Sequence, residues 1–220
     1  MIKPATFDFI NQVSKNNNRE WFAEHKADYE AARANVLAFI EVLIPILASI
    51  DTAFPKDTQA KSCLLRIYRD VRFSKDKSPY KTNFGIFFAV HGKTGAEPGY
   101  YINLAPGNCF FAAGYWMPDA ASLKNIREEI DYNSEEFLKI IEAKGFKELF
   151  EISREDTLKN APKGYPLDHP LIDILKLKSF NGILHFPDQA FLKPTIVDKL
   201  KTAFESIYPF ILFLRTAVEH

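Results

Sequence analysis

The sequence contains few cysteines and no net charge, and each of these features excludes a class of protein. Cys63 and Cys109 are the two cysteines among 220 residues. They are too few for a disulfide framework and lie in no metal-type pair, so we expect buried thiols in a reducing compartment. With 28 basic and 28 acidic residues, no overall field attracts nucleic acid or an anionic membrane. Binding of either would need a local patch.

The sequence also lacks a long uninterrupted apolar segment. The first twelve residues, MIKPATFDFINQ, contain no continuous apolar stretch of the length that a secretory signal needs. The most apolar run, 36–50, is interrupted by Glu41 and Pro45 and is shorter than the roughly 20 residues that span a bilayer. We therefore expect a buried helix there, and a cytoplasmic protein with no membrane partner.

Core-forming residues, by contrast, are abundant. Apolar residues make up 47% of the chain, and 20 of its residues are phenylalanine, which is typical of a soluble globular protein with a well-packed interior. No repeat, low-complexity tract or linker interrupts the sequence. We expect a single globular domain that covers residues 1–220.

Hydrophobic periodicity predicts helices at both ends of the chain and strands between them. Mixed three- and four-residue spacing favours helices over 6–15, 19–50, 120–132, 134–144 and 194–218, with a kink at Pro45 and a kink or break at Pro209. Trp21 and Phe22 should pack against the core. β-Branched and aromatic runs favour antiparallel strands over 63–73, 83–91, 99–105 and 109–116, joined by short connections over 74–82, 92–98 and 106–108. The prediction is an α+β fold, with a central antiparallel sheet of about four or more strands flanked by N-terminal and C-terminal helices.

Basic residues concentrate in one predicted strand and the connection after it, RIYRDVRFSKDKSPYKT, residues 66–82. In a regular strand Arg66, Asp70 and Arg72 share one face, whereas Arg69 lies on the opposite, apolar face. We expect Asp70 to pair with Arg72 or with Arg69. An unpaired guanidinium on an apolar face is costly, so Arg69 must find an acid or leave that face through a bulge.

The same segment is the best candidate for a ligand site. Its lysines and hydroxyls lie within a short connection and could surround an anion, to which Arg72 would offer a bidentate fork. The alternative is an ion-paired scaffold that ends in a solvated hairpin tip. The candidate ligand-binding residues are Arg66, Arg69, Arg72, Lys75, Lys77, Tyr80 and Lys81.

Candidate catalytic groups are few. His169 follows Asp168 in the proline-rich loop 161–170, and loop histidines that titrate near neutrality often act as general acids or bases. Asp70 is the third catalytic candidate. The alternative for the loop is a helix start with Asp168 near the cap.

Recognisable metal and cofactor motifs are absent from the sequence. It has no H-E-x-x-H pattern, phosphate-binding loop, dinucleotide fingerprint or serine-hydrolase elbow. His25 shares a helix face with Asp28, which is more typical of a polar surface group than of a metal site. We expect no metal ligand at His25 and no cofactor.

Three segments resemble one known family. They are NNNREWFAEHKADYE at 16–30, RIYRDVRFSKDKSPYKTNFGIFF at 66–88 and APKGYPLDHPLIDILKLKSF at 161–180. Together they are similar to the uncharacterised bacterial family named domain of unknown function 2461, over about residues 7–180. The resemblance implies a single whole-chain domain. It implies no activity, cofactor or catalytic residue.

Three functions remain open at the level of sequence. The first is a cytoplasmic anion-binding protein, enzymatic or not, that holds a phosphate- or carboxylate-type ligand in a concave site at the basic segment. The second is a non-enzymatic interaction domain that docks an acidic protein partner through the same segment, then convex and exposed. The third and least favoured is nucleic-acid binding, which needs a contiguous basic face. The aromatic runs GYYINL and CFFAAGYW could stack bases, although sheet aromatics under helices are far more often core.

Overall fold

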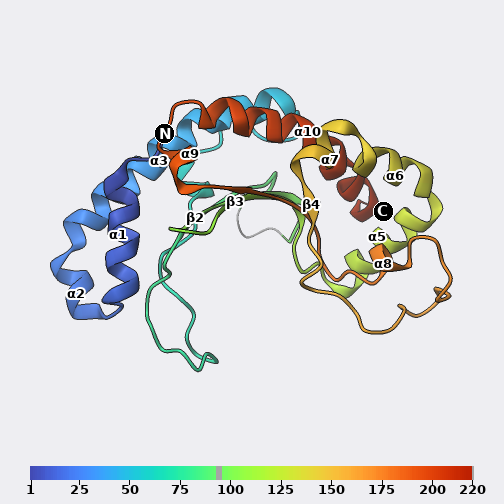
Figure 1. Ribbon diagram of the computed structural model, residues 1–220, viewed down its shortest axis with the longest axis horizontal. Coiled ribbons are helices and arrows are strands. Elements are labelled where there is room, and N and C mark those ends of the chain that lie inside the picture. Colours follow the sequence, from blue (N-terminus) through green and yellow to red (C-terminus); the bar gives the residue numbers. More distant parts are fainter. Residues whose placement is uncertain (93–95, 220) are drawn as a thin grey trace.

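The computed structural model describes residues 1–92 and 96–219. Residues 93–95 of the expected connection 92–98, and His220, lie outside the described part of the chain. Within that part, helices flank an open antiparallel sheet, which confirms the predicted α+β fold (Figure 1).

The sheet contains five strands among the described residues, in the order β1-β2-β3-β5-β4. Their bounds are β1 (Phe84–Phe88), β2 (Gly99–Leu104), β3 (Cys109–Tyr115), β4 (Glu151–Ile152) and β5 (Phe180–Phe186). The first three strands agree with the prediction, because short connections keep sequential strands together. β5 was not predicted. It contains Asn181 and Gly182, which are poor strand formers, and it is stabilised by pairing with β3 along its whole length.

The strand predicted over 63–73 was wrong. Residues Ala60–Cys63 form the short helix α4, and only Leu64 and Tyr68 make isolated bridges, to Ile86 and Tyr80. Beyond Tyr68 the side chains of the segment bond to its own backbone and to one another instead of to a neighbouring strand. Such local bonds compete with a regular ladder.

All five predicted helical regions are helical, and one of them is divided. The helix bounds are α1 (Pro4–Lys15), α2 (Arg19–Glu24), α3 (Lys26–Ile50), α5 (Ala120–Tyr132), α6 (Ser134–Glu142), α7 (Lys144–Leu149), α8 (Ile172–Leu175), α9 (Asp188–Phe191) and α10 (Ile196–Val218). The short helices α7, α8 and α9 were not predicted. The single helix expected over 19–50 divides at His25, which ends α2 and precedes α3. Pro45 and Pro209 lie inside α3 and α10, so the break considered at Pro209 does not occur.

Helices α3, α9 and α10 lie over one face of the sheet (Figure 1). Strand residues on that face, such as Ile86, Ile102 and Phe111, are fully buried in one hydrophobic cluster that runs through the chain. By length and composition alone α3 could cross a membrane. In the structure its apolar residues Val36 and Leu43 are buried in that cluster.

No helix covers the opposite face of the sheet in the described residues (Figure 1). We call this the open face. Phe87, Tyr101 and Phe110 alternate with the buried residues along β1, β2 and β3, and each remains partly exposed. At one end of the open face lie α1 and α2. At the other lie α5 and the segment that leads to α8.

A buried ion pair joins the two long helices to the sheet. Asp51 ends α3 and is fully buried, and Arg215 in the last turn of α10 donates to it from Nη1 at 2.8 Å. The Tyr100 hydroxyl on β2 donates to the other carboxylate oxygen at 3.0 Å. Burial and the Asp51 charge raise the pKa of Tyr100. Burial lowers the pKa of Arg215, but the hydrogen bond and charge of Asp51 outweigh it, and the net shift is upward.

Breaking this pair from one side should destabilise the fold strongly. Arg215→Met leaves the Asp51 carboxylate buried with the Tyr100 hydroxyl and the Ala53 N–H as its remaining partners and no compensating charge, so we expect the free energy of unfolding to fall by about 3 to 5 kcal/mol. Asp51→Asn/Arg215→Met removes both charges and should recover more than half of that loss. Urea denaturation followed by circular dichroism measures both. Arg33→Met is the control, because Arg33 reaches Glu30 at 4.0 Å on the surface and should contribute less than about 1 kcal/mol. Equal losses in Arg215→Met and Arg33→Met would contradict the expectation.

Candidate functional site

The basic segment forms an arm that projects from the edge of the sheet beside β1 (Figure 1). We call residues 64–83 the basic arm. It carries six arginine and lysine side chains against two aspartates, a local excess of four positive charges in a chain of zero net charge. The arm is therefore the local patch that anion binding would need.

The base of the arm is held by backbone hydrogen bonds. Leu65 N–H donates to the carbonyl of Gly85 in β1 at 2.9 Å, and Lys81 N–H donates to the carbonyl of Ile67 at 2.7 Å. Arg69 N–H donates to the carbonyl of Pro79 at 2.9 Å. The two sides of the arm thus pair with each other near the sheet, although they do not form a regular strand.

The corner between α1 and α2 clamps the arm. Asn17 Nδ2 donates to the carbonyl of Tyr80 at 2.9 Å, and Tyr80 N–H donates to Asn17 Oδ1 at 3.0 Å. The Phe22 ring stacks on the Tyr80 ring with centroids 3.9 Å apart. Phe22 is buried and Trp21 packs against the core, as predicted. The clamp is a direct contact between segment 16–30 and segment 66–88, two of the three segments that resemble the family. It also buries Tyr80, one of the ligand candidates.

Asp70 pairs with Arg72, as predicted. Arg72 donates from Nε to Asp70 Oδ1 at 3.0 Å and from Nη2 to Oδ2 at 2.7 Å, which is a bidentate fork. The hydrogen bonds from Arg72 lower the pKa of Asp70 to about 2. Both side chains are exposed, so the pair orders the arm and adds little to global stability.

Arg69 finds its acid in the connection. Its Nη1 donates to Asp76 Oδ2 and to the carbonyl of Ser78 at 3.1 Å. The backbone and hydroxyl of Ser78, and then Arg69, lower the pKa of Asp76 to about 2. Lys77 Nζ donates to the carbonyl of Val71 at 2.9 Å. Arg69, Arg72 and Lys77 are therefore all engaged within the arm.

Three cations of the arm remain. Among residues 1–92 and 96–219, the side chains of Arg66, Lys75 and Lys81 have no ion pair or hydrogen bond. Lys75 is exposed on the arm, whereas Lys81 is half-buried at its base. Burial, and then the charge of Arg66, lower the pKa of Lys81. The bond from Lys81 N–H to the Ile67 carbonyl places Lys81 across the arm from the residue next to Arg66.

The outer part of the arm exposes aromatic rings. Phe73 is 97% exposed, and the Arg72 guanidinium carbon lies 5.9 Å from the centre of its ring. Tyr68 is 54% exposed. An almost fully exposed phenylalanine is costly in water, and such residues often mark a contact surface.

The catalytic candidate His169 lies far from the arm, at the other end of the sheet near α5 (Figure 1). Its Nδ1 accepts from Leu171 N–H at 3.0 Å, so its proton is on Nε2, which lies 2.8 Å from Asp131 Oδ1 in α5. Asp168, its neighbour in sequence, is exposed. His169 therefore ties the loop 161–170 to α5, and it shares no cleft with Lys81.

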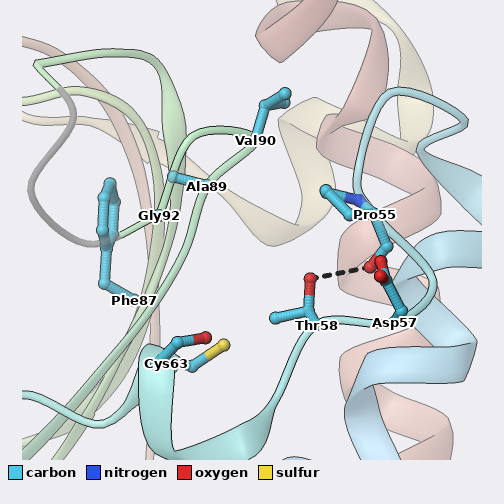
Figure 2. Close-up of a pocket in the computed structure, with 9 residues that line it drawn as sticks. Pro55, Asp57, Thr58, Cys63, Phe87, Ala89, Val90 and Gly92 are labelled. Atoms are coloured by element: carbon cyan, nitrogen blue, oxygen red, sulfur yellow. Dashed lines mark hydrogen bonds between the residues drawn. The ribbon is translucent and has the colours of Figure 1, made fainter.

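Two cavities lie away from the charges of the arm. The smaller, of about 200 Å³, is lined by Thr58, Cys63 and Phe87 among others (Figure 2), and Thr58 Oγ1 donates to the carbonyl of Pro55 at 2.7 Å. The larger, of about 450 Å³, lies among α1, α2 and α3 and includes His25.

The environments of His25 and the cysteines are structural. His25 stacks on Trp21 with centroids 4.1 Å apart, and its Nδ1 lies 2.9 Å from the Trp21 carbonyl. Both thiols are buried, as predicted, and burial raises the pKa of Cys109 to about 12. In the described part of the chain, no group of three or more His, Cys, Asp or Glu residues is placed to hold a metal ion.

Loss of the clamp should loosen the arm. Asn17→Ala removes both hydrogen bonds to Tyr80 and leaves two partly buried backbone groups unpaired, so the free energy of unfolding should fall by about 1 to 3 kcal/mol. Trypsin should also cleave the arm faster. The control is Asn11→Ala on the exposed side of α1. Identical cleavage of both variants, at the rate of the wild type, would show that the clamp does not order the arm.

The Asp70–Arg72 pair should appear in the titration of Asp70. Its folded-state pKa is depressed, so the pair is intact above the ordinary value of 3.8 and is lost as the pH falls through about 2. In Arg72→Ala the midpoint should return toward 3.8, whereas Asp76 should stay near 2, because its partners are Ser78 and Arg69. Carboxyl carbon NMR measures both. An unchanged Asp70 midpoint in Arg72→Ala would contradict the pair.

Comparison with known proteins places the chain in a family. A family model described as "Conserved hypothetical protein (DUF2461)" matches residues 5–213. No curated protein and no solved structure matches the chain. Because the match spans nearly the whole sequence, the chain belongs to the conserved hypothetical protein family DUF2461.

Proposed function

We propose that this protein binds an anionic ligand, of phosphate or carboxylate type, at the base of the basic arm between Arg66 and Lys81. The observation that carries the proposal is geometric: Lys81 N–H donates to the carbonyl of Ile67, the residue next to Arg66, and neither cation has an acidic partner within bonding distance among residues 1–92 and 96–219. Two like charges held close together are unfavourable. An anion between them would replace repulsion by two charge-assisted hydrogen-bonding contacts.

The two residues suit an anion in different ways. Arg66 offers a planar fork that matches two oxygens of a phosphate or carboxylate, and Lys81 offers a compact charge. Partial burial of Lys81 strengthens its interaction with an anion, because screening by water is weaker there. The hydrogen bonds from Arg72, and to a smaller extent the charge of Arg66, lower the pKa of Asp70. The Asp70 carboxylate accepts its side-chain hydrogen bonds from Arg72 and not from Arg66.

The other predicted ligand residues support the site indirectly. Arg69 and Arg72 are neutralised by Asp76 and Asp70 and give the arm its shape. Lys75 adds to the local positive potential that attracts an anion. Because His169 is engaged at the far end of the sheet, the proposal is one of binding and assigns no reaction.

A second candidate function is supported by the tip of the arm. Phe73 is almost fully exposed beside Arg72 on a projecting segment, and aromatic and arginine side chains are enriched among the residues that dominate protein interfaces. A local excess of four positive charges would complement an acidic partner protein. In this alternative the arm is a docking element, and a small anion has no site.

A thermal-shift screen tests the proposal. Phosphate, sulfate, nucleotides and dicarboxylates are added to the whole chain at low salt. A ligand at a hundredfold excess over its dissociation constant should stabilise the fold by about 2.7 kcal/mol, which is a melting shift of several degrees for a chain of this size. Added chloride should weaken the shift, because it screens exposed charges.

Variants of the arm show which residues are needed for the ligand-induced melting shift. Arg66→Ala/Lys81→Ala should abolish the shift, and Arg66→Lys should reduce it, because the planar fork is lost while the charge is kept. Lys75→Ala is the matched control and should retain most of the shift. A flat response to every ligand, or equal shifts in wild type and in Arg66→Ala/Lys81→Ala, would overturn the proposal and favour the acidic partner.

A further inference from the structure

The open face of the sheet carries aromatic and polar side chains in register across four strands. Asn103 on β2 lies opposite Phe110 on β3, and Phe110 lies opposite His185 on β5. Next to this row, Phe87 on β1 lies opposite Tyr101 on β2. Phe87, Tyr101 and Phe110 are partly exposed and His185 is exposed. In the described chain no helix lies over them (Figure 1).

Two glycines let rings of this face lie close to the sheet. A Cβ at Gly85 would stand 2.8 Å from the Tyr101 hydroxyl oxygen and 3.1 Å from a Tyr101 ring carbon, and a Cβ at Gly99 would stand 2.8 Å from the Phe87 ring. The two rings thus occupy the space above the glycines.

Three rings continue across the face. The centroids of Tyr101 and Phe110 are 5.8 Å apart, and those of Phe110 and His185 are 5.9 Å apart. We call Tyr101, Phe110 and His185 the ring row. Their planes are tilted by 49° and 57° to one another, so each ring offers a separate surface on which one flat ring can stack, as exposed aromatic rings do in proteins that bind single strands.

Polar groups connect the ring row to the arm. Asn83, the last residue of the arm, donates from Nδ2 to Asn103 Oδ1 at 2.7 Å and to the Tyr101 hydroxyl at 3.3 Å. The Tyr101 hydroxyl donates to Asn103 Oδ1 at 3.2 Å. Lys81 is two residues before Asn83, so their Cα atoms are at most about 7 Å apart. The base of the arm and the start of the ring row are therefore neighbours.

The chemistry of the face favours a polar ligand that contains flat rings. An apolar partner surface would desolvate the exposed His185 imidazole without a new hydrogen bond, which is costly. A ligand with hydrogen-bonding ring edges avoids this cost. A negative group on the same ligand would match the positive excess of the arm.

We propose that the open face binds nucleotide units, with phosphate at Arg66 and Lys81 and each base stacked on one ring of the ring row. The proposal rests on the anion site proposed above and names its ligand class. Free nucleotides and single-stranded nucleic acid present the same phosphate and base. Zero net charge disfavours nucleic acid for the chain as a whole, but the arm supplies the local basic patch beside the ring row.

Fluorescence anisotropy with a labelled oligothymidylate of about ten nucleotides tests the proposal at low salt. The whole chain should bind this probe. Phe110→Leu and His185→Ala each remove a ring and should each weaken binding by about tenfold. Tyr132→Ala is the matched control, because Tyr132 is 90% exposed at the end of α5 and is not part of the ring row, and this variant should bind like the wild type. His185 is exposed, so His185→Ala carries the test if Phe110→Leu does not fold.

Inorganic polyphosphate tests binding at the arm independently of stacking on the sheet, because it contains phosphate and no base. It should compete for the arm, and its affinity should fall in Arg66→Ala/Lys81→Ala but not in His185→Ala. If His185→Ala and Phe110→Leu bind the oligonucleotide as tightly as the wild type, the stacking proposal is overturned while the anion site stands. If neither polyphosphate nor oligonucleotide binds, the anion site fails as well.

Competition by single nucleotides distinguishes the two sources of the ligand. Uridine monophosphate that displaces the probe, and does so less well in His185→Ala, would assign a free nucleotide to the face. Displacement by an unlabelled oligonucleotide alone, with the same dependence on His185, would assign single-stranded nucleic acid. Ribose 5-phosphate that competes as strongly as the nucleotide would overturn stacking, since it has no base.

Discussion

The buried ion pair between Asp51 and Arg215 is the interaction on which the arrangement of helices over the sheet depends. A charge left alone at either position would be strongly destabilising, so the ends of α3 and α10 are held together, with Tyr100 of β2 as the third member. The two long helices thereby cover one face of the sheet (Figure 1), and large side chains on that face, such as Tyr100 and Phe111, are fully buried. The opposite face is left for other contacts.

Covering one face gives the two faces of the sheet different chemistry. Ile102 and Phe111 under the helices are fully buried, and the polar groups Asp51, Arg215 and Tyr100 on that side are bonded to one another. The open face keeps the Asn103 amide, which is bonded to Asn83 and to the Asn108 carbonyl, and it also has an exposed imidazole and partly exposed rings. Helices α1 and α2 lie at one end of this face and clamp the arm through Asn17 and Phe22. The helical corner thus sets the position of the basic arm beside the open face.

The charges of the arm show how far local sequence reasoning extends. The Asp70–Arg72 pair was predictable because the residues are two apart, and it formed although the segment is not a strand. The partner of Arg69 was not predictable, because Asp76 reaches it only when the connection turns back. Once these contacts and the Lys77 bond are made, the cations Arg66, Lys75 and Lys81 remain in the described part of the chain, and the sequence alone did not show which of the seven candidates these would be.

The sequence by itself determined the helices at both ends, strands β1 to β3 and the concentration of positive charge before β1, because these depend on periodicity, short connections and composition. Tertiary structure alone decided the pairing of β5 with β3, the bond between Asp51 and Arg215 across 164 residues and the engagement of His169 with Asp131. It also decided which face of the sheet is open. A period of two shows which strand residues share a face, but the face that meets the helices is chosen only when distant helices pack.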